Sequence, residues 1–438
     1  MTTTVTRPVR RMASYVLLAV TLAATLVTVS APANAQKVTP TFFGMHDSQI
    51  ANGSTPKVAL GSIRLWDSGT TWREIETQAP TPPLLPGQPT VYHYDFSKLD
   101  AAVANAQNAG LRPMIVLGQT PQFYATDPNA PSAYGPGASS MPNDIGAWQN
   151  YVATVASRYG TAVDYQIWNE PNVLQYWTGT PQQMATLTAT GAATINQAIG
   201  TGATVVAPGF PLRLQSQRTW FKQFWAQKVG GLGMASYVDV VAMHLYPPAD
   251  KGPETSVGLL KEGRALLPDA ARSKPEWNTE INYGLLGGAT AKQVSDATQA
   301  AYVARTLLLN AGSPIQRMYW YAWAQGGIAN THLVQADRST LTAGGKAWQR
   351  VYGWTLGTSF SNCSMISSGA AKGVWSCKAR KSRTETRRFY WKPTGRPAPI
   401  STVSSTSSWT SLKGRVTKHK GSYTIKVGQA PIMVTSRR

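Results

Sequence analysis

The chain has 438 residues, of which 42% are hydrophobic. This is enough for one large domain of about 250 to 350 residues and a second, smaller one. The formal net charge is +21. After the first 35 residues no segment is long and apolar enough to cross a bilayer, which excludes a protein with several membrane spans.

Residues 1–35 have the pattern of a secretory signal peptide. Three arginines precede the apolar run YVLLAVTLAATLVTV, and the small-residue pattern Ala33-Asn34-Ala35 follows it. We therefore expect a secreted protein, extracellular or associated with the cell surface, that begins at Gln36. An uncleaved membrane anchor is the alternative, although the apolar run is short for a membrane span.

Short branched or aromatic runs alternate with segments of helical period between about residues 40 and 355, which predicts βα units and a parallel sheet. The predicted strands are TFFGMH, LGSIRLW, RPMIVLG, VDYQIWN, ATVVAPG, VDVVAMHLY, KPEWNTE and QRMYWYAWA. The predicted helices cover 96–110, 144–160, 181–199 and 295–312. In 144–160, the clearest of them, apolar residues at spacings of three and four include Ile145, Trp148, Val152, Val155 and Tyr159.

Eight strands with intervening helices predict a (β/α)8 TIM barrel, an α/β fold, for residues 36–355. A doubly wound open sheet is the alternative. It is disfavoured because no glycine-rich phosphate-binding motif follows the first strand.

The last part of the chain, 356–438, is rich in Ser, Thr, Gly and Lys and contains short alternating runs such as RRFYW and SYTIKV. This pattern predicts a small all-β, sandwich-like domain. The two cysteines of the chain, Cys363 and Cys377, both lie in it, and we expect a disulfide between them because the chain has an export signal. Two free buried thiols are the alternative.

The positive charge is concentrated in the same part of the chain. Residues 361–438 contain 16 Lys and Arg but only one acidic residue, Glu385, whereas residues 36–360 are close to balanced. We expect this basic domain to bind an anionic partner such as a cell-wall polymer or an acidic exopolysaccharide. No specific nucleic-acid binding is expected of an exported protein, and a role in solubility alone is the alternative.

In a TIM barrel the active site forms at the C-terminal ends of the strands. Polar and aromatic side chains lie in or directly after six of the predicted strands. In chain order they are His46, Arg64, Asn169, Glu170, His244, Tyr246, Glu280 and Trp323.

The motifs WNEPN, HLYP and WNTE make the chain resemble clan A of the glycoside hydrolases over most of residues 40–350. The opening FFGMH and the segment SIRLWDSGTTW are most similar to family 39, with family 5 as the other choice. The resemblance implies that Glu170 is the acid/base and Glu280 the nucleophile of a retaining glycosidase. The resemblance also implies that no cofactor is needed.

The chemistry of retaining hydrolysis requires the same residue types. It needs two carboxyl groups about 5 to 5.5 Å apart, one protonated to release the leaving group and one ionised to attack the anomeric carbon. Strands four and seven face each other across a barrel mouth, which makes Glu170 and Glu280 the pair. We expect the negative charge of Glu280 to raise the pKa of Glu170.

Further roles follow from the resemblance. Asn169 matches a position that binds the sugar hydroxyl next to the anomeric carbon, and His46 and His244 match substrate-binding positions. Arg64 and Tyr246 match positions that hold the nucleophile ionised, with a structural ion pair and simple packing as the respective alternatives.

Two tryptophans, Trp177 and Trp323, are placed where sugar rings could stack on them. Packing in the barrel is the alternative for both, since large rings dominate cores too.

The leading hypothesis is a monomeric, secreted glycosidase that cleaves β-glycosidic bonds of a polysaccharide. The long Pro- and Gly-rich segments 78–94 and 124–144 suggest walls around a substrate groove and favour endo action. The other hypothesis is a non-catalytic glycan- or wall-binding protein on a barrel scaffold. The five histidines show no metal-ligand spacing such as H-E-x-x-H, so we expect no metal.

Overall fold

The computed structural model describes residues 1, 37–83, 85, 87–283, 294–324 and 331–437. The predicted signal segment therefore lies outside the described residues, apart from Met1. From residue 35 onward the chain forms one compact unit. No helix in the described part of the chain is long and apolar enough to cross a membrane.

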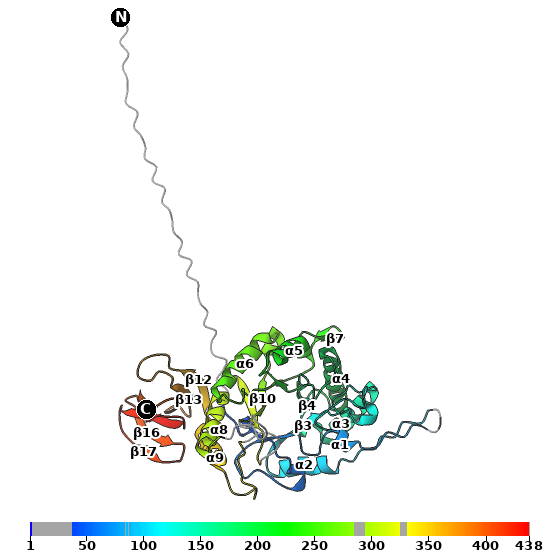
Figure 1. Cartoon of the computed structure of the whole chain (residues 1–438), viewed down its shortest axis with the longest axis horizontal. Helices are drawn as coiled ribbons and strands as arrows, with labels where there is room; N and C mark the ends of the chain where they lie inside the picture. The colour runs from blue at the N-terminus through cyan, green and yellow to red at the C-terminus, as the bar shows by residue number, and fades with distance from the viewer. Residues whose placement is uncertain (2–36, 84, 86, 284–293, 325–330, 438) are drawn as a thin grey trace. The chain divides into compact units, whose positions relative to one another are not determined.

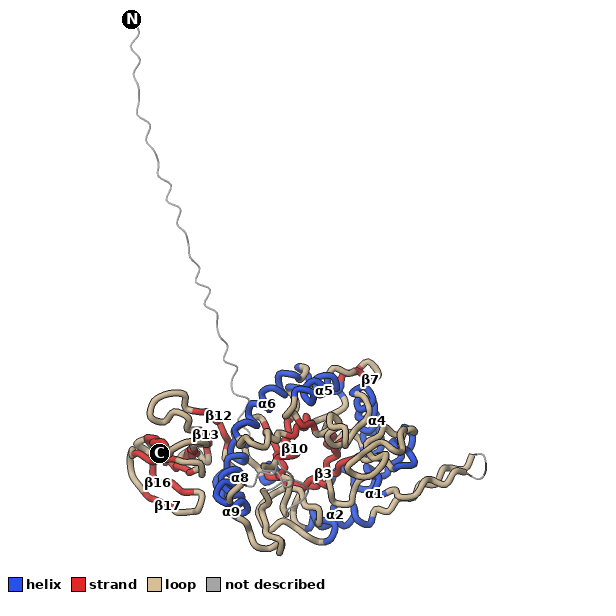
Figure 2. Tube along the Cα trace, in the orientation of Figure 1, coloured by secondary structure: helices blue, strands red, loops and turns tan. Residues whose placement is uncertain are grey.

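All eight predicted barrel strands are present as a curved sheet of parallel strands. Their bounds are β1 Phe43–Met45, β2 Ser62–Leu65, β3 Arg112–Leu117, β4 Asp164–Ile167, β5 Thr204–Val206, β6 Phe210–Pro211, β9 Val241–His244, β10 Glu276–Ile281 and β11 Ile315–Trp320. The order in the sheet is β5-β4-β3-β2-β1-β11-β10-β9-β6. Figure 2 shows these strands as a ring surrounded by helices.

The fifth barrel strand is interrupted, and this is where the ring closes. Parallel bridges join Val206 to Val240 and Asn169 to Gly209, and β6 pairs with β9. The segment from β5 to β6 thus connects β4 on one side with β9 on the other, which completes a (β/α)8 barrel. A short antiparallel hairpin, β7 Lys228–Val229 and β8 Leu232–Gly233, lies outside the ring.

The helices pack around the barrel (Figure 1). They are α1 Trp72–Ile75, α2 Ser97–Asn108, α3 Ile145–Tyr159, α4 Pro181–Ile199, α5 Gln215–Trp225, α6 Glu254–Leu266, α7 Asp269–Arg272, α8 Asp296–Ala311 and α9 Ala343–Thr355. Short 3-10 turns cover Pro40–Phe42, Ile50–Asn52, Gln122–Tyr124, Gly160–Ala162 and Met234–Ser236.

Helix α3 illustrates why these segments are helical. The carboxylate of Asp144 caps its first turn by accepting from the Gly146 amide, and Gly160 follows the helix with a positive φ of 56°. Trp148 and Val152 are buried, as the spacing predicts. Ile145 in the first turn is instead 37% exposed.

The barrel interior follows the two-residue period of the strands. Its lower layer is an apolar cluster of Met114, Val206, Val240, Ala242, Trp277 and Tyr319. Asp164 pairs there with Arg112 at 2.8 Å and with Arg317 at 2.6 Å. The next inward positions along β2, β4 and β9 are Arg64, Gln166 and His244. The strand period thus places polar groups at the mouth, above an apolar layer.

The C-terminal part is an antiparallel all-β domain. Its strands are β12 Ser359–Met365, β13 Trp375–Arg380, β14 Glu385–Trp391, β15 Ala398–Ser401, β16 Thr406–Ser411, β17 Val416–Lys418, β18 Thr424–Val427 and β19 Ile432–Arg437. Six form a sheet of order β12-β13-β14-β19-β16-β17, and β15 pairs with β18. A core including Ile400, Ile425 and Val434 joins the two sheets. Cys363 and Cys377 form the predicted disulfide between paired positions of β12 and β13.

The β domain packs closely on α6, α8 and α9 of the barrel. The Trp391 indole donates to Glu254 Oε1 at 2.7 Å, and the Arg305 guanidinium lies 3.4 Å from the same oxygen. Phe389 contacts Trp354 with ring centroids 6.1 Å apart. Trp391 and Arg305 are almost fully buried, so one carboxylate accepts a hydrogen bond from the β domain and pairs with a cation of the barrel.

The bond between Trp391 and Glu254 should contribute measurably to stability. We expect Trp391→Phe to cost more in the native background than in a Glu254→Ala background, with a coupling energy of about 1 to 3 kcal/mol, because the bond reaches a charged acceptor. Urea denaturation of the four proteins measures it. The lost ring volume is the same in both backgrounds, so equal costs would show that the bond contributes nothing.

Candidate active site at the mouth of the barrel

The backbone is strained where the strands end. Five non-glycine residues of the described chain have a positive φ, and four of them follow barrel strands. These are Asp67 after β2, Gln119 after β3, and Trp168 and Glu170 after β4. Such left-handed residues are costly and persist only where the surroundings hold them, which is typical of functional sites.

The end of β4 explains the motif IWNEP. The Trp168 amide still bonds to Leu117 of β3, whereas the Glu170 amide bonds to the Gly209 carbonyl on the other side. The left-handed turns at Trp168 and Glu170 allow this change of partner. The turn brings the Asn169 and Glu170 side chains to the barrel mouth.

The guanidinium of Arg64 is the centre of the site. It is fully buried, and it donates to Glu280 Oε1 at 2.6 Å, to Asn169 Oδ1 at 2.7 Å and to Gln166 Oε1 at 2.6 Å. The other oxygen of Glu280 accepts from the Tyr246 hydroxyl at 3.1 Å. Glu280 therefore has a donor on each oxygen, which stabilises its ionised form.

Glu170 approaches Glu280 beside His244. The Nδ1 atom of His244 lies 2.7 Å from Glu170 Oε1 and 3.5 Å from Glu280 Oε2. One oxygen of each carboxylate and a ring nitrogen of His244 all lie within 4.8 Å of one another. The ring lies against Gly209, where a Cβ would come within 2.3 Å of Nε2, so only glycine fits there.

Burial sets the protonation of this group. It raises the pKa of Glu170 to about 7, with Arg64 and Arg213 acting in the opposite direction. The cause differs from the expectation that the charge of Glu280 would be responsible. Burial also lowers the pKa of His244 to about 3, so the imidazole is neutral near neutral pH. Burial raises the pKa of Glu280 too, opposed by His244 and Arg64.

A third carboxylate at the site, Asp67, was not predicted. Its two oxygens accept from the hydroxyls of Tyr134 at 2.6 Å and Tyr321 at 2.7 Å. Its charge acts to raise the pKa of both Glu170 and Glu280. The only hint in the sequence is its position directly after a predicted strand, in SIRLWD.

The site contains two other polar side chains, one that the sequence did not indicate and one that it predicted. Gln166, which holds Arg64 Nε, was not singled out because amides in strands are common. His46 was predicted, and its Nε2 lies 3.1 Å from the Thr279 carbonyl. Burial lowers the His46 pKa well below its usual value, so the ring is neutral and Nε2 donates. Its Nδ1 has no hydrogen-bond partner among the described residues.

The two predicted stacking tryptophans are buried. Trp177 is 2% exposed and packs edge-on against Trp168, and Trp323 is fully buried. Neither ring has an open face for a sugar in this structure, which favours the alternative of packing. Of the long segments, 124–144 does line the site, through Tyr134.

The trio of Glu170, His244 and Glu280 also has the composition of a metal site, the one such cluster found in the described part of the chain. The Arg64 guanidinium, 2.6 Å from Glu280, already neutralises that carboxylate. A second cation beside it would be repelled, so the donor set suits proton transfer better than metal binding.

Comparison with solved structures supports this architecture. A family 39 glycoside hydrolase from Bacteroides cellulosilyticus WH2 has a TM-score of 0.63 and 17% identity, over 93% of this chain and 83% of that one. The catalytic domain of GH30 xylanase C from Talaromyces cellulolyticus has a TM-score of 0.62 and 17% identity, over 93% and 99%. A monomeric beta-xylosidase from Caulobacter crescentus CB15 has a TM-score of 0.61 and 14% identity, over 93% and 98%.

The chain has the fold of these glycoside hydrolases. The resemblance to clan A seen in the motifs is thereby confirmed at the level of the fold. No protein-family model and no curated protein sequence matches the chain.

The protonation of Glu170 can be measured directly. Its pKa of about 7 means that the carboxyl is protonated below neutral pH and ionised above it. Asp67→Asn removes a nearby negative charge, so the pKa of Glu170 should fall by several tenths of a unit or more. An NMR titration of ¹³C-labelled glutamates, with Glu170→Gln for assignment, measures it.

The matched control is Asp269→Asn on α7, which makes the same change at an exposed aspartate that pairs with Arg272 and should leave the pKa of Glu170 as it is. An unchanged or higher Glu170 pKa in Asp67→Asn would contradict the assigned effect of Asp67.

Proposed function

We propose that the protein is a retaining glycoside hydrolase that cleaves β-glycosidic bonds of a polysaccharide. The observation that carries the proposal is the approach of the Glu170 and Glu280 carboxylates, whose oxygens lie within 4.8 Å across the barrel mouth. Retaining enzymes hold their two carboxyl groups about 5 to 5.5 Å apart, whereas inverting enzymes leave about 6.5 to 9.5 Å for a water molecule.

In the first step Glu280 attacks the anomeric carbon while Glu170 donates its proton to the leaving-group oxygen. Arg64 and Tyr246 hold the Glu280 oxygens and keep the nucleophile ionised and oriented. A pKa of about 7 gives Glu170 the proton that it donates near neutral pH. The bond from the sugar to its leaving group breaks as the glycosyl ester on Glu280 forms.

In the second step Glu170 acts as a base. Esterification removes the charge of Glu280, and Glu170, ionised by the first step, takes a proton from the water that attacks the anomeric carbon. The ester bond between the sugar and Glu280 breaks in this step, which releases the Glu280 carboxylate. Asn169 is positioned for the neighbouring sugar hydroxyl. Its Oδ1 accepts from Arg64, and this orients the side chain so that the Nδ2 group can donate to the substrate.

A non-catalytic glycan-binding protein is the second candidate function. The basic β domain supports it, since such a surface could bind a polymer without any chemistry. Against it stands the complete pair of carboxylates, each with its own partners. Release of reducing ends from a polysaccharide panel distinguishes the two.

Xylan and β-xylosides are the first substrates to try, because two of the similar structures are described as a xylanase and a beta-xylosidase.

Within the proposed class we favour endo action by a monomer. The support for endo action is segment 124–144, which lines one side of the site through Tyr134. We also propose that the basic domain holds the enzyme to an anionic cell-wall or extracellular polymer, given 16 basic residues and one acid in 361–438.

Secretion is part of the same proposal and rests on the signal pattern in residues 1–35. When the full gene is expressed in a host with a general secretory pathway, the culture medium should contain protein that begins at Gln36. Amino-terminal sequencing checks this. Protein that stays in the membrane with its apolar segment intact would favour the anchor instead.

Chemical rescue tests the roles of the two carboxylates. Glu280→Ala and Glu170→Ala should each lose activity by about three orders of magnitude or more on an activated aryl β-glycoside or its polymer. External azide should give an inverted glycosyl azide with Glu280→Ala, since azide then replaces the nucleophile. It should give a retained glycosyl azide with Glu170→Ala, where azide attacks the glycosyl-enzyme.

NMR of the products assigns their configuration. The opposite stereochemistry would exchange the two roles, and the absence of any rescue in both variants would count against double displacement.

A further inference from the structure

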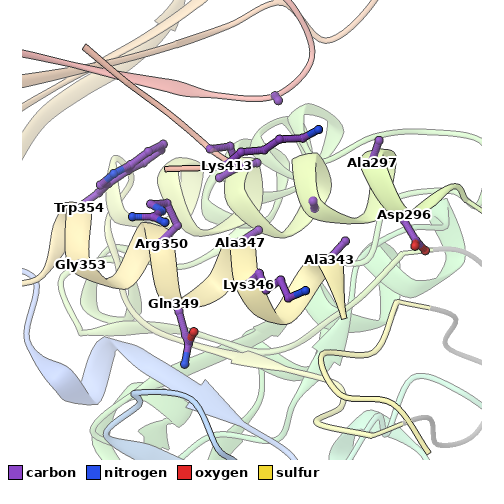
Figure 3. Close-up of a pocket in the computed structure, with 13 residues that line it drawn as sticks. Asp296, Ala297, Ala343, Lys346, Ala347, Gln349, Arg350, Gly353, Trp354 and Lys413 are labelled. Carbon is purple, nitrogen blue, oxygen red and sulfur yellow. The ribbon is translucent and has the colours of Figure 1, made fainter. Parts of the chain in front are cut away.

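A pocket of about 1000 Å³ lies between the barrel helices and the β domain, away from the barrel mouth (Figure 3). Helices α8 and α9 form one side, and two turns of the β domain form the other. The residues used below are Asp296 on α8, Lys346, Arg350 and Trp354 on α9, and Leu412 and Lys413 after β16. No residue of the carboxylate site contributes to the lining.

The floor of this interdomain pocket is apolar and made largely of small residues. Ala300 of α8 and Ala347 and Gly353 of α9 leave room that longer side chains would fill. An edge of Trp354 and the Leu412 side chain complete the apolar surface. Pockets with an apolar floor and a few polar groups at fixed positions are typical of small-ligand and sugar sites.

Three cations border this floor: Lys346, Arg350 and Lys413. All three are exposed, and their side chains make no hydrogen bond or ion pair with any residue that the structure describes. Other cations at the same domain contact do have partners. Arg387 binds Glu385 and the Trp354 carbonyl, and Lys381 donates to the Leu356 carbonyl.

The fold brings together the segments that carry two of these cations. The Arg350 guanidinium packs on Gly414, where a Cβ would come within 2.2 Å of Nη2, and Gly414 has a positive φ of 94°. Lys413 is the neighbouring residue in the same turn, and Figure 3 shows it reaching over the helices. The acid of the lining, Asp296, lies at the end opposite Trp354 (Figure 3).

We propose that the interdomain pocket binds a strand of acidic polysaccharide, with sugar carboxylates on Arg350 and Lys413. This inference rests on the proposed action on polysaccharides and places the anionic partner at a defined site. A guanidinium binds a carboxylate through two parallel hydrogen bonds. The C–H face of a pyranose ring fits the partly exposed apolar surface of Ala300, Ala343 and Leu412, which a polyol-phosphate chain without rings would leave uncovered.

The test uses the full-length protein and a hexamer of galacturonic acid, with xylohexaose as the neutral probe. Isothermal titration calorimetry should detect the acidic hexamer and no heat from the neutral one at this site. Arg350→Glu with Lys413→Glu should weaken binding of the acidic hexamer at least tenfold. The matched control is Lys420→Glu with Lys426→Glu, which makes the same change in net charge at exposed positions outside the pocket.

The control pair should weaken binding less than twofold. Equal losses in the two pairs would show diffuse attraction by the basic domain and overturn the proposal, as would the absence of binding to the native protein. A poly(glycerol phosphate) oligomer that binds as tightly, with the same dependence on Arg350 and Lys413, would replace the carboxylated sugar with a phosphate polymer and also overturn it.

Two controls separate this site from the barrel mouth. Glu280→Gln should bind the acidic hexamer as the native protein does, since the pocket contains no residue of the carboxylate site. Circular dichroism and turnover of a short neutral glycoside should be unchanged in the pocket variants. Pocket-dependent binding without turnover in any assay would remove the proposed hydrolase function but leave this inference, and turnover without such binding would do the reverse.

Discussion

The site depends on one buried cation. A buried guanidinium is costly unless it is paired and hydrogen-bonded, and each of the three nitrogens of Arg64 has a partner, in Gln166, Glu280 and Asn169. Because these partners come from β10 and from the end of β4, the pairing joins opposite sides of the barrel mouth. A lysine could not do so, since it lacks the planar fork that reaches three acceptors at once. The same guanidinium therefore orients both the Glu280 carboxylate and the Asn169 amide.

The charge of this cation acts on two carboxylates, Glu170 and Glu280, and burial raises the pKa of both. Glu170 contacts the neutral ring of His244 and is protonated near neutral pH, whereas Glu280 has the direct contact with Arg64. Asp67 is held by two tyrosine hydroxyls from distant loops. The environments of Glu170 and Glu280 thus differ in the way that an acid and a nucleophile require, although both are glutamates within one small site.

The β domain carries most of the charge and meets the barrel through a separate set of contacts. Glu254 accepts from Trp391 and forms an ion pair with Arg305, so the domain contact is polar as well as apolar. The same contact creates the interdomain pocket, where Arg350 of α9 packs on Gly414 of the β domain and Lys413 is a second exposed cation of the lining. Residues 36–360 are close to balanced in charge, whereas three exposed cations line the pocket, so the proposed chemistry and the proposed polymer binding have separate places in the fold.

The sequence by itself determined the barrel strands, the β domain, the disulfide and the residues Arg64, Asn169, His244, Tyr246 and both glutamates at the mouth. Branched and aromatic runs indicate strands, and the C-terminal ends of parallel strands lie on one face of the barrel. Local sequence patterns are therefore enough to predict the strands and the residues at their ends. Only the tertiary structure decided the rest. Asp67 bonds to tyrosines 67 and 254 residues away, Trp323 is fully buried, and Arg350 packs on Gly414 where the two domains meet. Such contacts depend on distance in space, and no local pattern encodes them.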